Sequence, residues 1–216
     1  MTDSNDVFSS LNDGYRRFRE KMWHPQRDRW MQLREGQAPK VMVIACSDSR
    51  VDPAQVFDVD PGEIFVVRNV AAMVPPFETT PGHHGVSAAL EFAVQVLKVE
   101  EIVVLGHGMC GGCAAALHQS MRGAEPGNGG FIADWIDLLD DAREEVAASH
   151  GIEGRSAERA MEEAAVKVSI ANLRTFPCIR AKEGKGTLTL RGGFFAISDG
   201  ILHWLDEATG TFGPAT

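Results

Sequence analysis

The feature that most constrains the fold is a set of three short, uninterrupted apolar runs in the first half of the chain. They occupy residues 41–45, 64–67 and 102–105. A continuous apolar run of this length is typical of a strand that is buried on both faces of a parallel sheet. Helical patterns separate the runs, so the sequence predicts an α/β sheet with right-handed crossovers.

The remaining elements extend this α/β pattern. Asp52 and Pro53 form an N-cap and first helical position before a short helix at residues 54–57. Helices are also expected at residues 86–97, 111–121, 135–146 and 156–176, a fourth strand at 187–190 and a fifth at 201–205. The predicted fold is a mostly parallel sheet of order 2-1-3-4 with helices on both faces and an antiparallel edge strand.

The first 36 residues differ from the rest and are predicted to form a helical arm. Apolar residues recur there at spacings of three and four, with charged residues between them: Phe8, Leu11, Tyr15, Phe18 and Met22. Such a stripe marks an amphipathic helix. The helix could cover the core of its own domain or pack on a partner subunit. Residues 37–216 are expected to form a single α/β domain.

Composition excludes several classes of protein. The chain has 216 residues and a formal net charge of −9, which disfavours a nucleic-acid-binding surface. It has no apolar run near the ~20 residues of a membrane span. The N-terminal residues lack the pattern of a secretory signal, so we expect a cytoplasmic protein. Its four cysteines are too few for a disulfide scaffold and need another explanation.

Chemically active side chains follow the first and third predicted strands. Cys46-Ser-Asp48-Ser-Arg50 follows the first, and Gly-His107-Gly-Met-Cys110-Gly-Gly-Cys follows the third. In a sheet of order 2-1-3-4 these two strand ends meet where ligands bind. Two thiols and one imidazole form a set that favours zinc, and three protein ligands leave a fourth position open for catalysis.

Other interpretations of these cysteines stay open at this stage. A buried cysteine is often only a small apolar side chain. Cys110 and Cys113 form a Cys-x-x-Cys pair after a strand, which is typical of a redox protein. A closed structural site that adds Cys113 as a fourth ligand would leave Asp48 and Arg50 without a role.

Three segments of the chain resemble those of the β-class carbonic anhydrases: residues 45–51 (ACSDSRV), 61–69 (PGEIFVVRN) and 106–112 (GHGMCGG). The resemblance implies a lyase that interconverts carbon dioxide and bicarbonate. It implies Cys46, His107 and Cys110 as zinc ligands and Asp48 with Arg50 as a catalytic dyad. It also suggests a homodimer or a dimer-based oligomer, with the N-terminal helix reaching the partner.

The resemblance further implies a substrate pocket of polar and apolar residues. Gln37, nine residues before Cys46, would donate a hydrogen bond to substrate oxygen. Phe65, Val70 and Gly108 would line the pocket together with Phe92, which stands where a tyrosine is usual in one subgroup. Another subgroup has a tryptophan of a non-catalytic bicarbonate site at the position of Val43, so we expect no such site here.

The chemistry of this ligand set predicts how the reaction would run. Zinc-bound hydroxide, oriented by Asp48 paired with Arg50, would attack carbon dioxide. Two thiolate ligands make the metal centre formally neutral, so the pKa of the bound water should exceed ~7 and activity should rise with pH. Asp48 could instead take the fourth zinc position in a closed, inactive state. A zinc hydrolase of carbonyl sulfide or carbon disulfide remains an alternative.

Overall fold

The structure, a computed structural model, describes residues 4–215 of the chain. These residues divide into two compact units, of which the first ends at Ala38 and the second begins at Pro39. The strands of the second unit are β1 (Val41–Cys46), β2 (Ile64–Asn69), β3 (Glu101–His107), β4 (Thr189–Ala196), β5 (Ile201–Asp206) and β6 (Thr211–Pro214). Its α-helices are α3 (Pro53–Val56), α4 (Gly85–Glu91), α5 (Gly111–His118), α6 (Gly130–Ile136), α7 (Asp140–His150), α8 (Gly154–Leu173) and α9 (Pro177–Glu183). Shorter helical turns are η2 (Val70–Ala72), η3 (Phe92–Leu97) and η4 (Asp137–Leu139).

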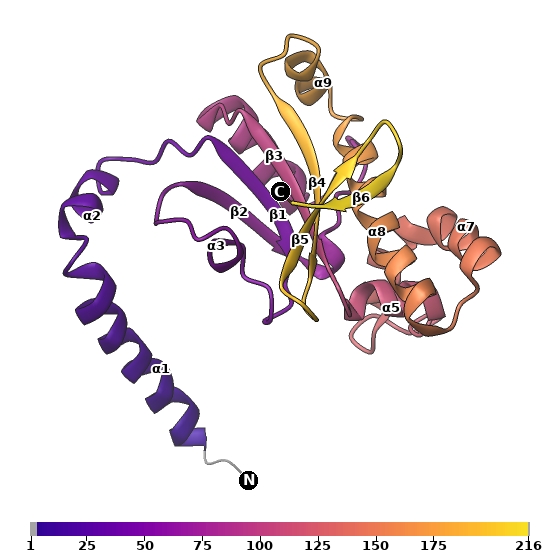
Figure 1. The fold of residues 1–216 in the computed structure, drawn as a ribbon, viewed down its shortest axis with the longest axis horizontal. Helices are drawn as coiled ribbons and strands as arrows, with labels where there is room; N and C mark the ends of the chain where they lie inside the picture. Colours follow the sequence, from indigo (N-terminus) through magenta and orange to yellow (C-terminus); the bar gives the residue numbers. More distant parts are fainter. Residues whose placement is uncertain (1–3, 216) are drawn as a thin grey trace. The chain divides into compact units, whose positions relative to one another are not determined.

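The strands described in the second unit form one sheet of order β2-β1-β3-β4-β5-β6 (Figure 1). The first four strands pair in parallel, and β5 pairs antiparallel to β4. The predicted order 2-1-3-4 with an antiparallel edge strand is therefore confirmed. Strand β6, which pairs antiparallel to β5, was not predicted because its four residues include Gly213 and Pro214 and show no apolar alternation.

The predicted fourth strand, at residues 187–190, covers only the start of the observed one. Strand β4 runs from Thr189 to Ala196 and passes through Gly192 and Gly193, which weaken a strand pattern in a sequence. The structure gives the reason for both glycines. A Cβ at Gly192 would lie 2.9 Å from Val166 of α8, and one at Gly193 would lie 3.1 Å from Trp204 of β5. Close packing on both faces requires glycine there.

All four of the longer predicted helices have different bounds in the structure. The one expected at 86–97 becomes α4 and the π-helical turn η3, and the one expected at 156–176 is α8, which ends at Leu173. The helix expected at residues 135–146 is divided into α6, η4 and α7, and the backbone leaves helical geometry at Leu139. The helix expected at 111–121 ends at His118, because Gln119 adopts a left-handed conformation with φ +51°. By contrast, α3 begins as predicted: the Asp52 carboxylate accepts hydrogen bonds from the amides of Ala54 and Gln55.

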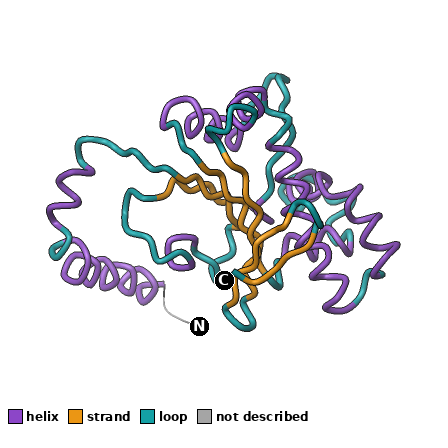
Figure 2. The backbone as a smooth tube through the Cα atoms, turned by 45° about the horizontal axis from the view of Figure 1, so that its top comes forward, coloured by secondary structure: helices purple, strands orange, loops and turns teal. Residues whose placement is uncertain are grey.

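Helices cover the two faces of the sheet unequally (Figure 2). On one face, Met42, Ile44, Ile102 and Val104 pack against apolar residues of α4, η3, α8 and α9 in the larger core. On the other face, Val43 and Val103 pack with the short helix α3 and with Trp204 of β5. This second face therefore has much thinner cover among the residues of the second unit.

The first unit consists of α1 (Ser4–Phe18), a π-helical turn η1 (Arg19–Trp23) and α2 (Arg27–Leu33). The rings of Phe18 and Trp30 meet edge to face at 5.9 Å and hold α1 against α2. Within this unit, most of the predicted apolar stripe is exposed, with Phe8 and Leu11 each 68% accessible. The stripe is thus not covered by α2.

Candidate metal centre

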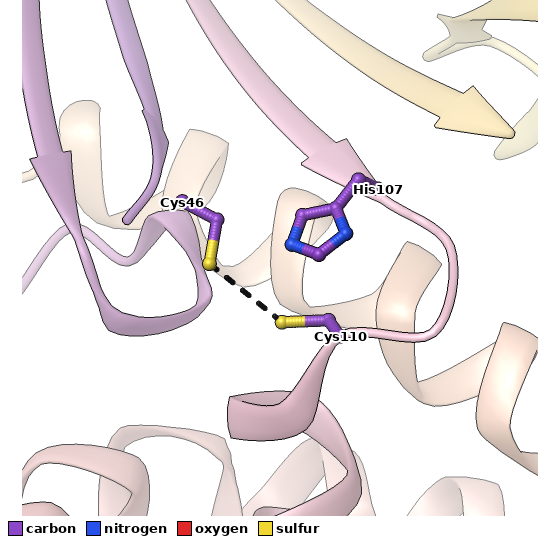
Figure 3. A group of neighbouring side chains, drawn as sticks. All are labelled: Cys46, His107 and Cys110. Atoms are coloured by element: carbon purple, nitrogen blue, oxygen red, sulfur yellow. Dashed lines mark hydrogen bonds between the residues drawn. The ribbon is translucent and has the colours of Figure 1, made fainter. Parts of the chain in front are cut away.

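Three potential metal ligands converge at the carboxyl ends of β1 and β3 (Figure 3). Cys46 is the last residue of β1, His107 is the last residue of β3, and Cys110 is the N-cap of α5. Because β1 and β3 are parallel neighbours, their ends fall at the same edge of the sheet. The turn through Gly108 and Met109 then brings Cys110 back toward Cys46.

The geometry of the three side chains fits one zinc ion. The sulfurs of Cys46 and Cys110 lie 3.9 Å apart, and all three ligand atoms lie within 4.8 Å of one another. Two sulfurs bound tetrahedrally to one zinc at about 2.3 Å would lie about 3.8 Å apart. All three residues are buried, and His107 Nε2 has no hydrogen-bond partner among the described residues. A cation between the sulfurs and Nε2 would satisfy this atom.

The electrostatics of the cluster disfavour thiolates at neutral pH unless a cation is bound. Contact with the Cys110 sulfur and burial raise the pKa of Cys46 to about 12. The neighbouring Cys113 thiol, together with burial, raises the pKa of Cys110 to about 12. Without a metal both thiols therefore stay protonated at neutral pH. A zinc ion would reverse this preference, because it binds the thiolate forms and releases their protons.

The tautomer of His107 is set by its own loop. Its Nδ1–H donates to the carbonyl oxygen of Gly108 at 2.9 Å, which leaves the lone pair of Nε2 free to face the thiols. Burial lowers the pKa of His107, but the Cys46 sulfur and the Gly108 carbonyl raise it by more. The net pKa therefore lies above the usual value in the metal-free chain.

Asp48 and Arg50 form a bidentate ion pair at the edge of this cluster. Arg50 Nε donates to Asp48 Oδ1 at 2.9 Å, and Arg50 Nη2 donates to Oδ2 at 2.7 Å. The guanidinium of Arg50 holds the pKa of Asp48 well below its usual range. Asp48 Oδ2 lies 3.9 Å from His107 Nε2, and Arg50 Nη2 also donates to the carbonyl of Met109. The pair thus joins the two loops that carry the cysteines and the histidine.

Arg68 holds the first of these loops in place and was missed in the sequence. Its guanidinium donates to the carbonyls of Cys46, Asp48 and Val51 and to the carboxylate of Asp52. The signal was an arginine inside the otherwise apolar run of β2. A charge at such a place needs several partners, and the turn after a neighbouring strand can supply them.

Glu162 of α8 was also missed. It is 3% exposed, and its Oε1 accepts a hydrogen bond from the amide of Cys110 at 3.2 Å. Desolvation by burial raises the pKa of this carboxyl above its usual value. The signal in the sequence was a glutamate on the same helix face as Val166 and Ser169, both of which are buried.

The residues predicted to line a substrate pocket are not all brought together within one chain. Val70 lies near the cluster, since a Cβ on Gly112 of α5 would come within 2.7 Å of its Cγ1. Phe65 pairs with Met42, four residues before Cys46 on β1, which corresponds to about 13 Å at roughly 3.3 Å per residue. Phe65 and Phe92 instead contact each other, with ring centroids 5.9 Å apart.

The other two predicted pocket residues have different surroundings. Gly108 is buried next to His107, and its amide donates to the carbonyl of Phe195 at the end of β4. Gln37 belongs to the first unit, where it is exposed. Its role as a hydrogen-bond donor to substrate stays a prediction.

Comparison with known proteins identifies the family. Residues 41–202 match the family model for carbonic anhydrase. Over 198 residues the chain is 34% identical to β carbonic anhydrase 5 of Arabidopsis thaliana, which is named as a chloroplastic protein. The chain belongs to the β-class carbonic anhydrase family. The match covers 91% of this β-class chain but 64% of the plant protein, so the chain spans somewhat less than two thirds of that relative.

Solved structures of β-carbonic anhydrases share the fold. The chain superposes on the β-carbonic anhydrase CcaA with a TM-score of 0.89 and 30% identity, covering 98% of this chain and 93% of CcaA. A tetrameric β-carbonic anhydrase of Sordaria macrospora matches with a TM-score of 0.79 and 27% identity, and the match covers 96% of this chain and 99% of the fungal one. The predicted family and fold are therefore confirmed.

The described residues contain no helix that is long and apolar enough to cross a membrane. The plant relative is named as chloroplastic, so the cytoplasmic location of this β-class chain stays a prediction.

Proposed function

We propose that the chain is a zinc enzyme that catalyses the reversible hydration of carbon dioxide to bicarbonate and a proton. The observation that carries this proposal is the convergence of Cys46, His107 and Cys110 at one buried point in a β-class carbonic anhydrase fold. These three residues would hold the ion and leave its fourth position open, as in catalytic zinc sites. Zinc bound there would supply Lewis acidity that lowers the pKa of a water molecule.

Asp48 and Arg50 would orient the nucleophile in this proposal. Asp48 stays ionised because it is paired with Arg50, so its carboxylate can only accept a hydrogen bond. It lies 3.9 Å from the metal-facing nitrogen of His107, within reach of a group at the open position. By accepting a hydrogen bond from the O–H of the attacking group, Asp48 would direct that oxygen's lone pair toward carbon dioxide.

The paired arrangement also bears on the closed state predicted from the sequence. Asp48 could become a fourth ligand only by giving up its two side-chain bonds to Arg50. Arg50 is in turn held by the carbonyl of Met109 on the opposite loop. The proposal therefore takes the paired, open arrangement as the active one.

An apolar slot would receive carbon dioxide, which is small, neutral and a poor hydrogen-bond partner. Val70 is positioned to line it within one chain, because it lies against Gly112 near the cluster. Phe65 pairs with Met42, four strand residues before Cys46, and Phe92 packs against Phe65. We propose that they contribute to the slot of a second copy of the chain rather than to their own.

The N-terminal arm would be the element that joins two copies. Its stripe is exposed within the first unit, with Leu11 68% and Tyr15 58% accessible. The thinly covered sheet face of the second unit has an apolar hollow of about 550 Å³, lined in part by Val43, Phe57 and Trp204. We propose that the stripe of one copy packs on the sheet face of another.

The arm proposal is tested by light scattering after gel filtration. We expect the wild type to have at least twice the chain mass of 23.5 kDa and the Leu11→Glu/Tyr15→Glu double variant to be monomeric. The matched control is Arg17→Glu, which changes a charge on the same helix without altering the stripe. A monomeric wild type, or a double variant that assembles normally, would refute the role of the arm.

The proposed activity is tested by metal content and stopped-flow carbon dioxide hydration at pH 7 and pH 9. We expect about one zinc per chain and faster hydration at pH 9 in the wild type, and loss of both in Cys46→Ala. Zinc without hydration would instead favour a non-catalytic metal site or a substrate such as carbonyl sulfide or carbon disulfide. A protein that binds no metal would favour a redox role for Cys110 and Cys113.

A further inference from the structure

The carboxylate of Glu162 lies buried directly behind the loop that carries two of the three proposed ligands. It is 3% exposed, and Oε1 accepts the amide hydrogen of Cys110 at 3.2 Å. Its other oxygen, Oε2, has no hydrogen-bond partner among residues 4–215. Arg155 Nη1 lies 3.7 Å from Oε1, but the Arg155 side chain is 57% exposed. The carboxylate is thus only partly compensated.

Helix α8 is packed tightly against this part of β3. A Cβ on Gly106 would lie 2.6 Å from a methyl group of Val166, so glycine lets the strand and helix touch. Glu162 lies one turn before Val166 on α8 and therefore reaches the loop that follows β3. Its position is fixed by the packing of the helix rather than by a flexible surface contact.

The loop that Glu162 contacts is conformationally demanding. Met109, between His107 and Cys110, has φ +57°, a left-handed conformation that is unfavourable for a residue with a side chain. Arg50 holds the carbonyl of Met109 from one side, and Glu162 holds the amide of Cys110 from the other. Arg50 and Glu162 thus hold the two ends of the same peptide unit, the one that joins Met109 to Cys110.

Folding alone gives no reason for a glutamate at this position. A buried carboxylate with one unpaired oxygen is destabilising, and an apolar side chain of similar size would cost less free energy there. In known metal sites, partners that hold the ligands are needed for full metal affinity. The presence of a destabilising glutamate next to the proposed metal ligand Cys110 is therefore explained best by an effect of the glutamate on that ligand.

We propose that Glu162 is a positioning residue that holds the Cys110 amide, and with it the Cys110 thiol, in the orientation required for zinc binding. This inference rests on the zinc site proposed above. The property that matters is an acceptor oxygen at the Cys110 amide. Glu162→Gln keeps such an oxygen, whereas Glu162→Met fills a similar volume without it.

The test is the zinc affinity of these variants, measured on the full chain by competition with a chromophoric chelator. We expect Glu162→Met to bind zinc about 10–100-fold more weakly than the wild type. Glu162→Gln should stay within about threefold. Cobalt(II) substitution provides an independent signature, because a displaced Cys110 thiolate should weaken the sulfur-to-cobalt absorption in Glu162→Met and leave it intact in Glu162→Gln.

Glu163 offers matched controls on the same helix. It is partly exposed and pairs with Arg159 on the same helix at 2.5 Å. Glu163→Gln and Glu163→Met should keep wild-type zinc affinity. If Glu162→Met does not fold, Glu162→Asp replaces it. Its carboxylate is withdrawn by one methylene, and we expect about tenfold weaker zinc binding.

The possible failures can be told apart. A wild type that binds no zinc would overturn the proposed zinc site and this inference with it. A wild type that binds zinc, together with a folded Glu162→Met of equal affinity, would overturn only the role of Glu162. Equal losses in Glu162→Gln and Glu162→Met would show that an acceptor oxygen is not what the site requires.

Discussion

Replacing Arg68 should weaken both the fold and the proposed metal site, because one side chain holds the whole loop after β1. In the structure its guanidinium spans four acceptors, of which the carbonyls of Cys46 and Val51 are partly shielded from solvent. The other two, the Asp48 carbonyl and the Asp52 carboxylate, are exposed. Arg68→Met keeps much of the side-chain volume and removes all four hydrogen bonds.

The size of the effect follows from which acceptors water can reach. Each lost hydrogen bond to a shielded carbonyl should cost about 1–1.5 kcal/mol, and water should replace most of the exposed ones. The expected loss in the free energy of unfolding is therefore about 2–3 kcal/mol. For a chain of this length that corresponds to a fall in Tm of about 4–12 °C. Arg68→Lys should recover little of this stability, since one ammonium group cannot donate to all four acceptors as the planar guanidinium does.

The assay is urea denaturation and thermal melting at fixed chain and zinc concentrations, since bound metal and assembly shift apparent stability. Arg122→Met is the matched control, because Arg122 is an exposed arginine that lies 3.8 Å from Asp140 at the surface and should contribute at most about 1 kcal/mol. Zinc affinity should fall in Arg68→Met and not in Arg122→Met. A change below about 0.5 kcal/mol in Arg68→Met would refute the reasoning.

Four further predictions concern the site and the helix that follows it. Asp48→Asn should keep its zinc and lose hydration activity by about 100-fold or more. Since Arg50 lowers the pKa of Asp48, the stability that this ion pair contributes should be present above about pH 4 and be lost as the pH falls below it. The Tm difference between wild type and Asp48→Asn should shrink below about pH 4, and a difference that stays constant down to about pH 2 would contradict it. Gly112→Ala should cost about 1–3 kcal/mol in urea denaturation, because its Cβ would lie 2.7 Å from Val70, and an unchanged midpoint would count against this packing. Cys113→Ser should hydrate carbon dioxide within about twofold of wild type in reducing buffer, whereas a redox function would be lost.

Much of the fold could be predicted because its signals are local. Uninterrupted apolar runs marked β1, β2 and β3, and Asp52-Pro53 marked the start of α3. Only the first two residues of strand β4 were predicted, since Gly192 and Gly193 are required by Val166 and Trp204, which are distant in sequence. The break at Leu139 was missed because apolar spacing continues across it.

The sequence by itself indicated the residue types of the proposed metal ligands and the loops that carry them. Cys46 and His107 end two parallel strands and Cys110 follows three residues after His107, and strand order brings such ends together. Only the tertiary structure decided what holds those ligands. Arg68 and Glu162 bind backbone carbonyls and amides, which any residue could supply. No pattern of side chains in the sequence therefore indicates these two contacts. The tertiary structure also placed Phe65 far from Cys46. The strand register pairs Phe65 with Met42, and this register, not the order of the motifs in the sequence, fixes the distance between Phe65 and Cys46.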